Sequence, residues 1–204
     1  MVGRVARWSR NQWREARHWL LLVRNGLNAT SALRLRAGRT DDLRFQGRAL
    51  ACTNPELAAR QLLAIFGGEY APEGFVPRRG DVVVDIGANI GVYSLYAAHK
   101  GAQVVAYEPH PETFALLKAN TTGRNVECHQ AAVVGKGTDP VALWINPDRD
   151  TRHTLFGTEI IKGTKLTKSI NVPAVPIDDV LKNGCDNSPP HILHRIQFPN
   201  YAEI

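Results

Sequence analysis

Two carboxylates, two glycines and one amide lie close together in the sequence, with a spacing that could bind a small charged molecule. The pattern D-x-G-x-N-x-G comprises Asp85, Gly87, Asn89 and Gly91, and Glu108 follows about 20 positions after the first glycine. A glycine turn followed by a carboxylate at this distance is typical of nucleotide-binding βαβ units, in which the carboxylate accepts hydrogen bonds from ribose hydroxyls. Glycine also lets a ligand approach the main chain closely.

The middle of this pattern indicates which nucleotide fits. Asn89 occupies the position of the second glycine of dinucleotide sites, where a side chain would crowd a pyrophosphate. Its amide could instead exchange hydrogen bonds with an amino-acid moiety, and Asp85 could face an ammonium group. Glu108 could accept hydrogen bonds from both hydroxyls of a ribose. A cationic amino acid joined to a nucleoside meets these demands, which predicts S-adenosylmethionine as the cofactor.

The elements that must position these residues are readable on either side of the turn. Residues 82–84 are three valines, a run typical of a strand buried on both faces. Helical spacing of apolar residues begins at Ile90, and Gly101 is placed to end that helix. Residues 103–107 form a second apolar run with Glu108 at its carboxyl end. The sequence therefore predicts strand, turn, helix and strand.

A further helix is predicted to start at Pro111, because proline is favoured in a first helical turn. Its candidate core residues are Phe114, Leu116, Leu117 and Ala119. VECHQAAVV (residues 126–134) then predicts the third strand and its exit. We interpret His110 as a loop side chain and His129 as structural, and we assign no catalytic base.

Two more strands are predicted at residues 141–145 and 169–175, separated by a long polar segment that could help to recognise an acceptor. We expect the pair to form an antiparallel hairpin added to the main sheet. Asp178 and Asp179 favour the start of a short helix that runs to Lys182.

Several of these segments together resemble the FkbM-type family of S-adenosylmethionine-dependent methyltransferases. They are VVVDIGANIGVYSLYAA, AYEPHPETFALLKAN and VPAVPIDDVL, and FGGEYAPEGFVPRRGD is similar to the family's approach to its first strand. The resemblance covers roughly residues 32–186. It implies an α/β fold, a Rossmann-like methyltransferase sheet with helices on both faces, and methyl transfer to a hydroxyl of a sugar or another small-molecule or glycan acceptor. It also implies that Ala132 lies near the adenine, beside the cofactor residues named above.

The family pattern breaks after Asp186. The acidic K-I-D-x-E-G-A-E block of the family's fourth core strand is replaced by NSPPHILHRIQFPNYAEI. We therefore expect a sheet truncated after its first strands, with one edge and one face of the central strand exposed. HILHRIQF (residues 191–198) could form a replacement edge strand, and His191 and His194 do not predict a metal site.

The segment before the first strand predicts a lead-in of two elements. Residues 31–45 alternate apolar and charged side chains around Ala37-Gly38, which predicts a hairpin. Asn54-Pro55-Glu56 predicts the start of a helix that Gly67-Gly68 ends. Tyr70 follows in a loop, either as a packed aromatic side chain or as a lid over the cofactor.

The N-terminus is strongly basic. Residues 1–50 hold eleven arginines against three acidic residues, a balance of +8, so the remainder of the chain with net charge +6 carries about −2. Residues 1–27 suit a basic amphipathic helix, and its apolar face would comprise Val2, Ala6, Trp13, Ala16, Leu20 and Val23. Such a helix either packs on the domain or makes peripheral contact with a membrane surface. A nucleic-acid partner is not expected, because no aromatic-basic module follows.

Length and composition set the remaining limits. A chain of 204 residues with 44% hydrophobic and 22% charged residues suits one globular domain. The three cysteines show no disulfide framework or zinc pattern, which favours a reducing, cytoplasmic location. We divide the chain into a basic helix (1–30), a lead-in (31–80), a cofactor-binding core (81–186) and a divergent tail (187–204).

Three functions follow as alternatives. The first is an S-adenosylmethionine-dependent methyltransferase. The second is a catalytically inactive cofactor-binding remnant or interaction module, which the missing acidic block favours. The third is a nicotinamide-dependent oxidoreductase, which would use the same βαβ arrangement. Asn89 at the position of the second glycine disfavours it.

Overall fold

The computed structural model describes residues 10–67, 76–136, 139–145, 155, 168–183 and 193–196, of which residues 10–16, 183 and 193–196 are described by their backbone alone. The chain divides into two compact units. One comprises residues 1–50 and 55–74, and the other comprises residues 51–54 and 75–204. Tyr70 lies outside the described residues, so its predicted role stays a prediction.

The N-terminal unit consists of three helices and a small hairpin. They are α1 (Arg10–Arg24), α2 (Ala29–Arg36), β1 (Arg44–Phe45), β2 (Arg48–Ala49) and α3 (Pro55–Phe66). Its core contains the fully buried Leu62 and the tilted ring pair of Phe45 and Phe66, whose centroids lie 5.4 Å apart. The start of α3 at Pro55 and its end before Gly67 confirm the predicted helix.

The structure corrects the hairpin predicted around Ala37-Gly38. Residues 29–36 form α2 instead, because alanine, leucine and arginine favour a helix and the alternation is too short to impose a strand. The hairpin lies further on, between β1 and β2. Its two turn residues, Gln46 and Gly47, both have positive φ (46° and 84°), as a two-residue type I′ turn requires.

Helix α1 lies inside the range 1–27 predicted as a basic helix, and it corrects one residue of the predicted apolar face. Leu20 is 59% exposed, whereas Leu22 is only 2% exposed. Two positions along a helix correspond to about 200° of rotation, so these leucines lie on nearly opposite sides. Val23 is half-buried, and the side chains before residue 17 are not described.

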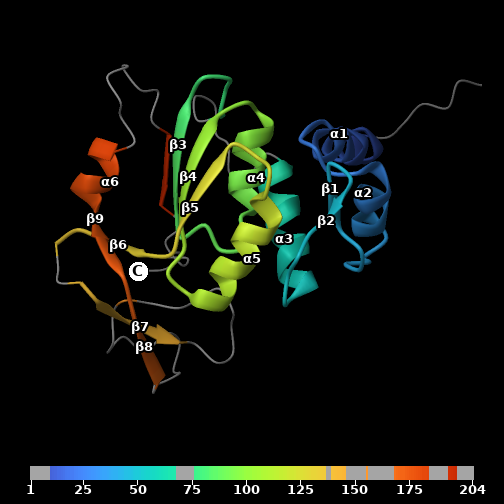
Figure 1. Ribbon diagram of the computed structural model, residues 1–204. Coiled ribbons are helices and arrows are strands. Elements are labelled where there is room, and N and C mark those ends of the chain that lie inside the picture. The colour runs from blue at the N-terminus through green and yellow to red at the C-terminus, as the bar shows by residue number, and fades with distance from the viewer. Residues whose placement is uncertain are drawn as a thin grey trace, which may run out of the picture. The chain divides into compact units, whose positions relative to one another are not determined.

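The α/β unit contains a parallel four-stranded sheet with the strand order β10-β3-β4-β5. The elements are β3 (Val82–Ile86), α4 (Val92–His99), β4 (Gln103–Tyr107), α5 (Pro111–Thr121), β5 (Val126–His129) and β10 (Leu193–Ile196). Helix α4 connects β3 to β4, and α5 connects β4 to β5 (Figure 1). The predicted strand–turn–helix–strand unit is therefore present, and β3, β4 and β5 all end at the same edge.

Strand β10 corrects the expectation that one edge of the central strand is exposed. It pairs in parallel with β3, on the side opposite β4, with Leu193 aligned to Val83 and Ile196 to Ile86. The predicted replacement strand at residues 191–198 is thus confirmed in its four described residues. Pairing saturates the backbone groups that β3 would otherwise leave open at that edge.

Both faces of the central strands are covered. Val84 and Tyr107 pack with Ala131 and with Val180 of α6 (Ile177–Asn183) on one face. Figure 1 shows α4 and α5 on the opposite face. The expectation of an exposed face is therefore wrong, while the predicted short helix near Asp178 and Asp179 is confirmed, with both residues in its first turn.

The remaining strands form two small sheets. The residues predicted as the third strand and its exit, 126–134, form two strands. After β5, strand β6 (Ala132–Val134) leaves the main sheet and pairs in parallel with β9 (Ala174–Pro176). Strands β7 (Val141–Ile145) and β8 (Lys168–Val172) form the predicted antiparallel pair, but as their own two-stranded sheet and not as an addition to the main one. Pro173 separates β8 from β9, because proline cannot donate a ladder hydrogen bond.

One core assignment in α5 is also corrected. Ala119 is exposed, and Asn120 takes the buried position beside it, at 8% exposure.

Among the described residues, no helix is long and apolar enough to span a membrane. Within the same residues, no cluster of histidine, cysteine and acidic side chains could hold a metal ion.

Candidate functional site

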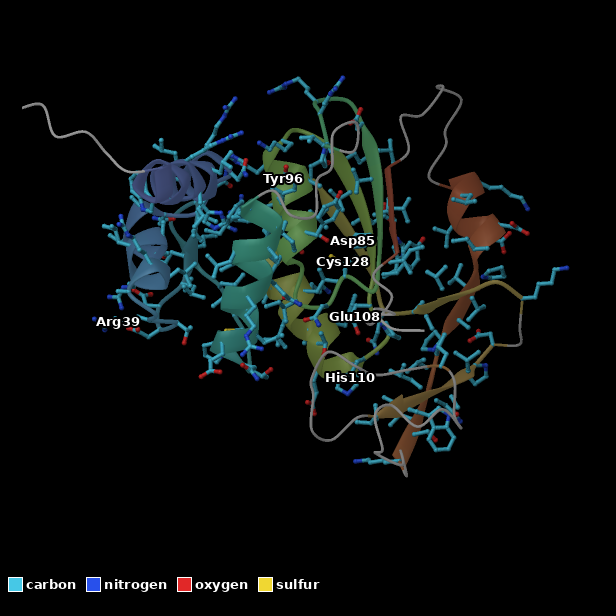
Figure 2. All side chains as sticks on the ribbon, turned by 180° about the vertical axis from the view of Figure 1, so that it is seen from behind. Arg39, Asp85, Tyr96, Glu108, His110 and Cys128 are labelled. Atoms are coloured by element: carbon cyan, nitrogen blue, oxygen red, sulfur yellow. The ribbon has the colours of Figure 1, made fainter. Side chains whose placement is uncertain are left out.

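The candidate site lies where β3 and β4 end and the turn of residues 87–91 begins. Three residues of this turn have positive φ: Gly87 (73°), Asn89 (52°) and Gly91 (86°). For Asn89 this left-handed conformation is uncommon, although asparagine tolerates it better than most residues. In Figure 2, Asp85 lies within the sheet, and Glu108 and then His110 lie progressively nearer to the end of the sheet at which the strands finish.

The turn uses all five of its own N–H groups within the protein. Gly87 and Ala88 both donate to the carbonyl of Tyr107 at 2.9 Å, and Gly91 donates to Ala88 at 2.9 Å. The N–H of Asn89 donates to Glu108 Oε2 at 2.9 Å, and the N–H of Ile90 to Asn89 Oδ1 at 2.6 Å. A phosphate-binding turn instead directs its N–H groups at the ligand. This turn is therefore not built to cradle a pyrophosphate.

Glu108 holds two elements together through its carboxylate. Oε2 accepts the N–H of Asn89, and Oε1 accepts the N–H of His110 at 3.0 Å. The side chain is 7% exposed, and burial raises the pKa of Glu108 to about 7, although the two backbone hydrogen bonds act to lower it. The charge of nearby Asp85 adds to the rise. Since an ionised carboxylate has about four acceptor positions, two remain after these bonds.

Asp85 lies under α4 and not on the open side of the turn. Its Oδ2 accepts a hydrogen bond from the hydroxyl of Ser94 at 2.6 Å, and both side chains are completely buried. The strand places Asp85 on the face opposite Val84, because side chains alternate along a strand. Ser94 was not singled out by the sequence, although its spacing of nine residues from Asp85 follows directly from the strand–turn–helix connection.

Gly91 has a packing role that the sequence did not indicate. A Cβ atom built there would lie 2.7 Å from Leu117 Cδ1 and 3.3 Å from Thr121 Cγ2. The glycine therefore permits close packing between the start of α4 and α5, in addition to its positive φ. This explains the residue type without a ligand.

The other predicted residues lie at different distances from this centre. Asn89 is 8% exposed, and its side-chain oxygen caps its own turn. Ala132 packs in a separate cluster with Leu143 and Val172, while Ala131 belongs to the cluster that contains Tyr107. The structure thus joins Asp85, Gly87, Asn89, Gly91 and Glu108 around one turn, and it does not pack Ala132 among them.

The two histidines have structural contacts, as we interpreted them. His110 precedes α5, and its Nδ1 lies 3.2 Å from Thr113 Oγ1. The ring of His129 stacks on Tyr107 with centroids 4.9 Å apart, and its Nε2 lies 3.0 Å from Glu127 Oε1. These contacts account for both side chains within the fold.

The chemistry of this site favours a cationic ligand with hydroxyl groups over a phosphate ligand. Two buried carboxylates, Asp85 and Glu108, flank a turn whose N–H donors are already engaged. Such a site is rich in acceptors, so it complements a ligand that brings hydroxyl donors and positive charge.

The comparisons with known proteins found two methyltransferases similar to this chain. The chain is 48% identical over 123 residues (54% of this chain and 47% of that protein) to the 31-O-demethyl-FK506 methyltransferase FkbM of Streptomyces tacrolimicus. It is 35% identical over 81 residues (38% of this chain and 32% of that protein) to Methyltransferase 1 of Beauveria bassiana. The chain thus matches about half or less of the length of these curated relatives. No solved structure matches it significantly.

The family comparison covers the candidate site. The model of the Methyltransferase FkbM domain matches residues 85–194, which run from the first carboxylate of the site into β10 and make up more than half of the chain. The chain therefore belongs to the FkbM methyltransferase family.

Proposed function

We propose that this protein is an S-adenosylmethionine-dependent methyltransferase that methylates a hydroxyl of a sugar or another small-molecule or glycan acceptor. The observation that supports it most is the turn itself, whose five N–H groups are engaged internally beside two buried carboxylates. Family membership supports the same reaction class. The name of the Streptomyces relative refers to a small molecule that lacks an O-methyl group, which supports an oxygen acceptor.

S-adenosylmethionine supplies a methyl group already activated on a sulfonium sulfur. In our proposal Glu108 accepts hydrogen bonds from the ribose hydroxyls through the acceptor positions that Asn89 and His110 leave open. Asp85 contributes negative charge beneath the turn, which favours a cationic ligand over a neutral one. The rigid turn then fixes the orientation of the ligand, the main contribution that an enzyme makes to an in-line displacement.

Calorimetric titration with S-adenosylmethionine tests the cofactor assignment. We expect micromolar binding by the 204-residue chain, weakened about tenfold or more by Glu108→Gln, which removes the charge and one acceptor oxygen. Glu112→Gln is the matched control, because this exposed glutamate lies in the first turn of α5. A folded chain that releases no binding heat would refute the proposal.

Turnover separates an enzyme from a cofactor-binding remnant. The chain is incubated with S-adenosylmethionine and a panel of hydroxylated acceptors (sugars, glycans and macrocyclic alcohols), and S-adenosylhomocysteine is quantified. Acceptor-dependent product that Glu108→Gln reduces supports the methyltransferase. Cofactor binding without product on any acceptor would favour the inactive alternative.

A further inference from the structure

Asn120 makes a set of contacts that neither the sequence pattern nor the proposed chemistry explains. Its Oδ1 accepts the N–H of Ala51 at 2.7 Å, and its Nδ2 donates to the carbonyl of Ala51 at 2.9 Å. The same Nδ2 donates to the carbonyl of Ile90 at 2.8 Å, inside the turn of residues 87–91. One buried amide therefore joins two segments that are far apart in the sequence.

These bonds continue a hydrogen-bonded chain that reaches Glu108. The N–H of Ile90 donates to the side-chain oxygen of Asn89, and the N–H of Asn89 donates to Glu108 Oε2. Each link is between 2.6 and 2.9 Å long. Consecutive hydrogen bonds in a buried setting polarise and rigidify one another. The carboxylate that we assign to the ribose is thus connected to the backbone of Ala51.

The series of hydrogen bonds ends at Ala51, in a segment that the division into units sets apart. Residues 51–54 belong to the α/β unit, whereas residues 50 and 55 on either side belong to the N-terminal unit. Both backbone groups of Ala51 are bonded to Asn120 and not to a strand partner. The side chain of Asn120 therefore satisfies the backbone N–H and C=O of Ala51, as a neighbouring strand would in a sheet.

We propose that Asn120 is a positioning residue of the cofactor site, which couples residues 51–54 to the turn so that a ligand held at the turn also tightens this segment. The inference rests on the proposed function for the identity of that ligand. Only an amide meets the requirement, because the three bonds use one carbonyl oxygen and both hydrogens of one NH2 group. Aspartate would lack both donors, and leucine would lack all three groups.

Cys52 provides a probe beside the contact. It is a free, half-buried thiol next to Ala51, and burial raises its pKa, so it reacts slowly unless the segment opens. The experiment measures iodoacetamide alkylation of Cys52 by peptide mass spectrometry, with and without saturating S-adenosylmethionine. We expect the ligand to slow alkylation of the wild-type chain about fivefold or more, as expected when local opening is suppressed.

Asn120→Ala is the decisive variant, since it removes the side-chain bonds and keeps the helix. We expect alkylation of Cys52 about tenfold faster without ligand, and at most about twofold protection by S-adenosylmethionine. Thr121→Val is the matched control: its hydroxyl donates to the Leu117 carbonyl in α5 and lies 3.3 Å from Cys128 Sγ, and valine keeps its methyl group against Gly91. The control should behave like the wild-type chain.

The outcomes distinguish this inference from the proposed function. If calorimetry shows binding but the ligand does not slow alkylation in the wild-type chain, the coupling is refuted whatever the variants do. If Asn120→Ala reacts no faster than Thr121→Val without ligand, the contact at Ala51 is not what holds the segment. If the chain binds no S-adenosylmethionine, the proposed function fails, and the ligand-free comparison still decides the role of Asn120.

Discussion

The hydroxyl of Ser94 donates to Asp85 Oδ2 at 2.6 Å, and neither side chain has any exposed surface. A hydrogen bond to a buried carboxylate contributes more than a neutral one, because the carboxylate has no water to replace the lost donor. We therefore expect Ser94→Ala to lower the free energy of unfolding by about 2 kcal/mol, measured by urea denaturation.

The matched control for this substitution is Ser169→Ala, which removes a hydroxyl from an exposed position of β8. That change should alter the free energy of unfolding by less than about 0.5 kcal/mol. If both variants unfold at the same urea concentration, the bond between Ser94 and Asp85 makes no net contribution to stability.

Alanine substitutions at Gly91 and Gly80 distinguish the cost of backbone strain from the cost of steric overlap. Both have positive φ (86° and 91°), but a Cβ at Gly80 meets nothing within 4 Å, whereas one at Gly91 meets Leu117 Cδ1 at 2.7 Å. We expect Gly80→Ala to cost about 1 kcal/mol from backbone strain alone. Gly91→Ala should cost about 3 kcal/mol, because the strain is joined by overpacking against Leu117, which is fully buried.

Differential scanning calorimetry of the two variants measures this comparison. S-adenosylmethionine affinity should also fall for Gly91→Ala, since the turn must shift to relieve the contact, and stay unchanged for Gly80→Ala. Equal losses of stability would mean that α4 and α5 separate easily, and would contradict the packing role of Gly91.

The part of the site that the sequence predicted is the part made by neighbouring residues. A valine run, a glycine turn and helical spacing lie within one short segment, so the sequence alone places Asp85, Gly91 and Glu108 around a single turn. Local patterns of this kind carry their own physical explanation, since each residue type matches the dihedral or face that it occupies.

The part that could not be predicted depends on contacts between distant segments. Asn120 reads as an ordinary polar residue of α5, and nothing in its surroundings signals a partner 69 positions earlier. Strand β10 is similar, because an edge strand is chosen by the gap that it fills beside β3. The hairpin predicted at the wrong place has another cause: its true turn, Gln46-Gly47, lacks the Asn-Gly or Asp-Gly pair that is the strongest sequence signal for a two-residue hairpin turn.

The engaged N–H groups of the turn lead to a prediction about phosphate ligands. Saturating NAD should not raise the Tm of the chain, whereas S-adenosylmethionine should, because the turn has no N–H of its own to offer a pyrophosphate. Asn89→Gly restores the glycine of dinucleotide sites but frees only the N–H of Ile90. We therefore expect this variant still not to respond to NAD in a thermal shift assay, and a response equal to that of S-adenosylmethionine would support an oxidoreductase.

The raised pKa of Glu108 predicts how stability depends on pH. Its pKa is about 7 in the folded chain against 4.5 for the unperturbed group, so the folded state binds the proton more tightly. The resulting stability is fully present below pH 4.5 and is lost as pH rises through 7. A shift of this size corresponds to about 3 kcal/mol. Glu108→Gln cannot titrate, so its free energy of unfolding relative to the wild-type chain should rise by about that amount between pH 4.5 and 8. Urea denaturation across this range measures the difference, and Glu112→Gln, at an exposed position in the first turn of α5, should show no comparable slope. A pH-independent difference for Glu108→Gln would mean that the buried carboxylate ionises as readily in the folded chain as in the unfolded one.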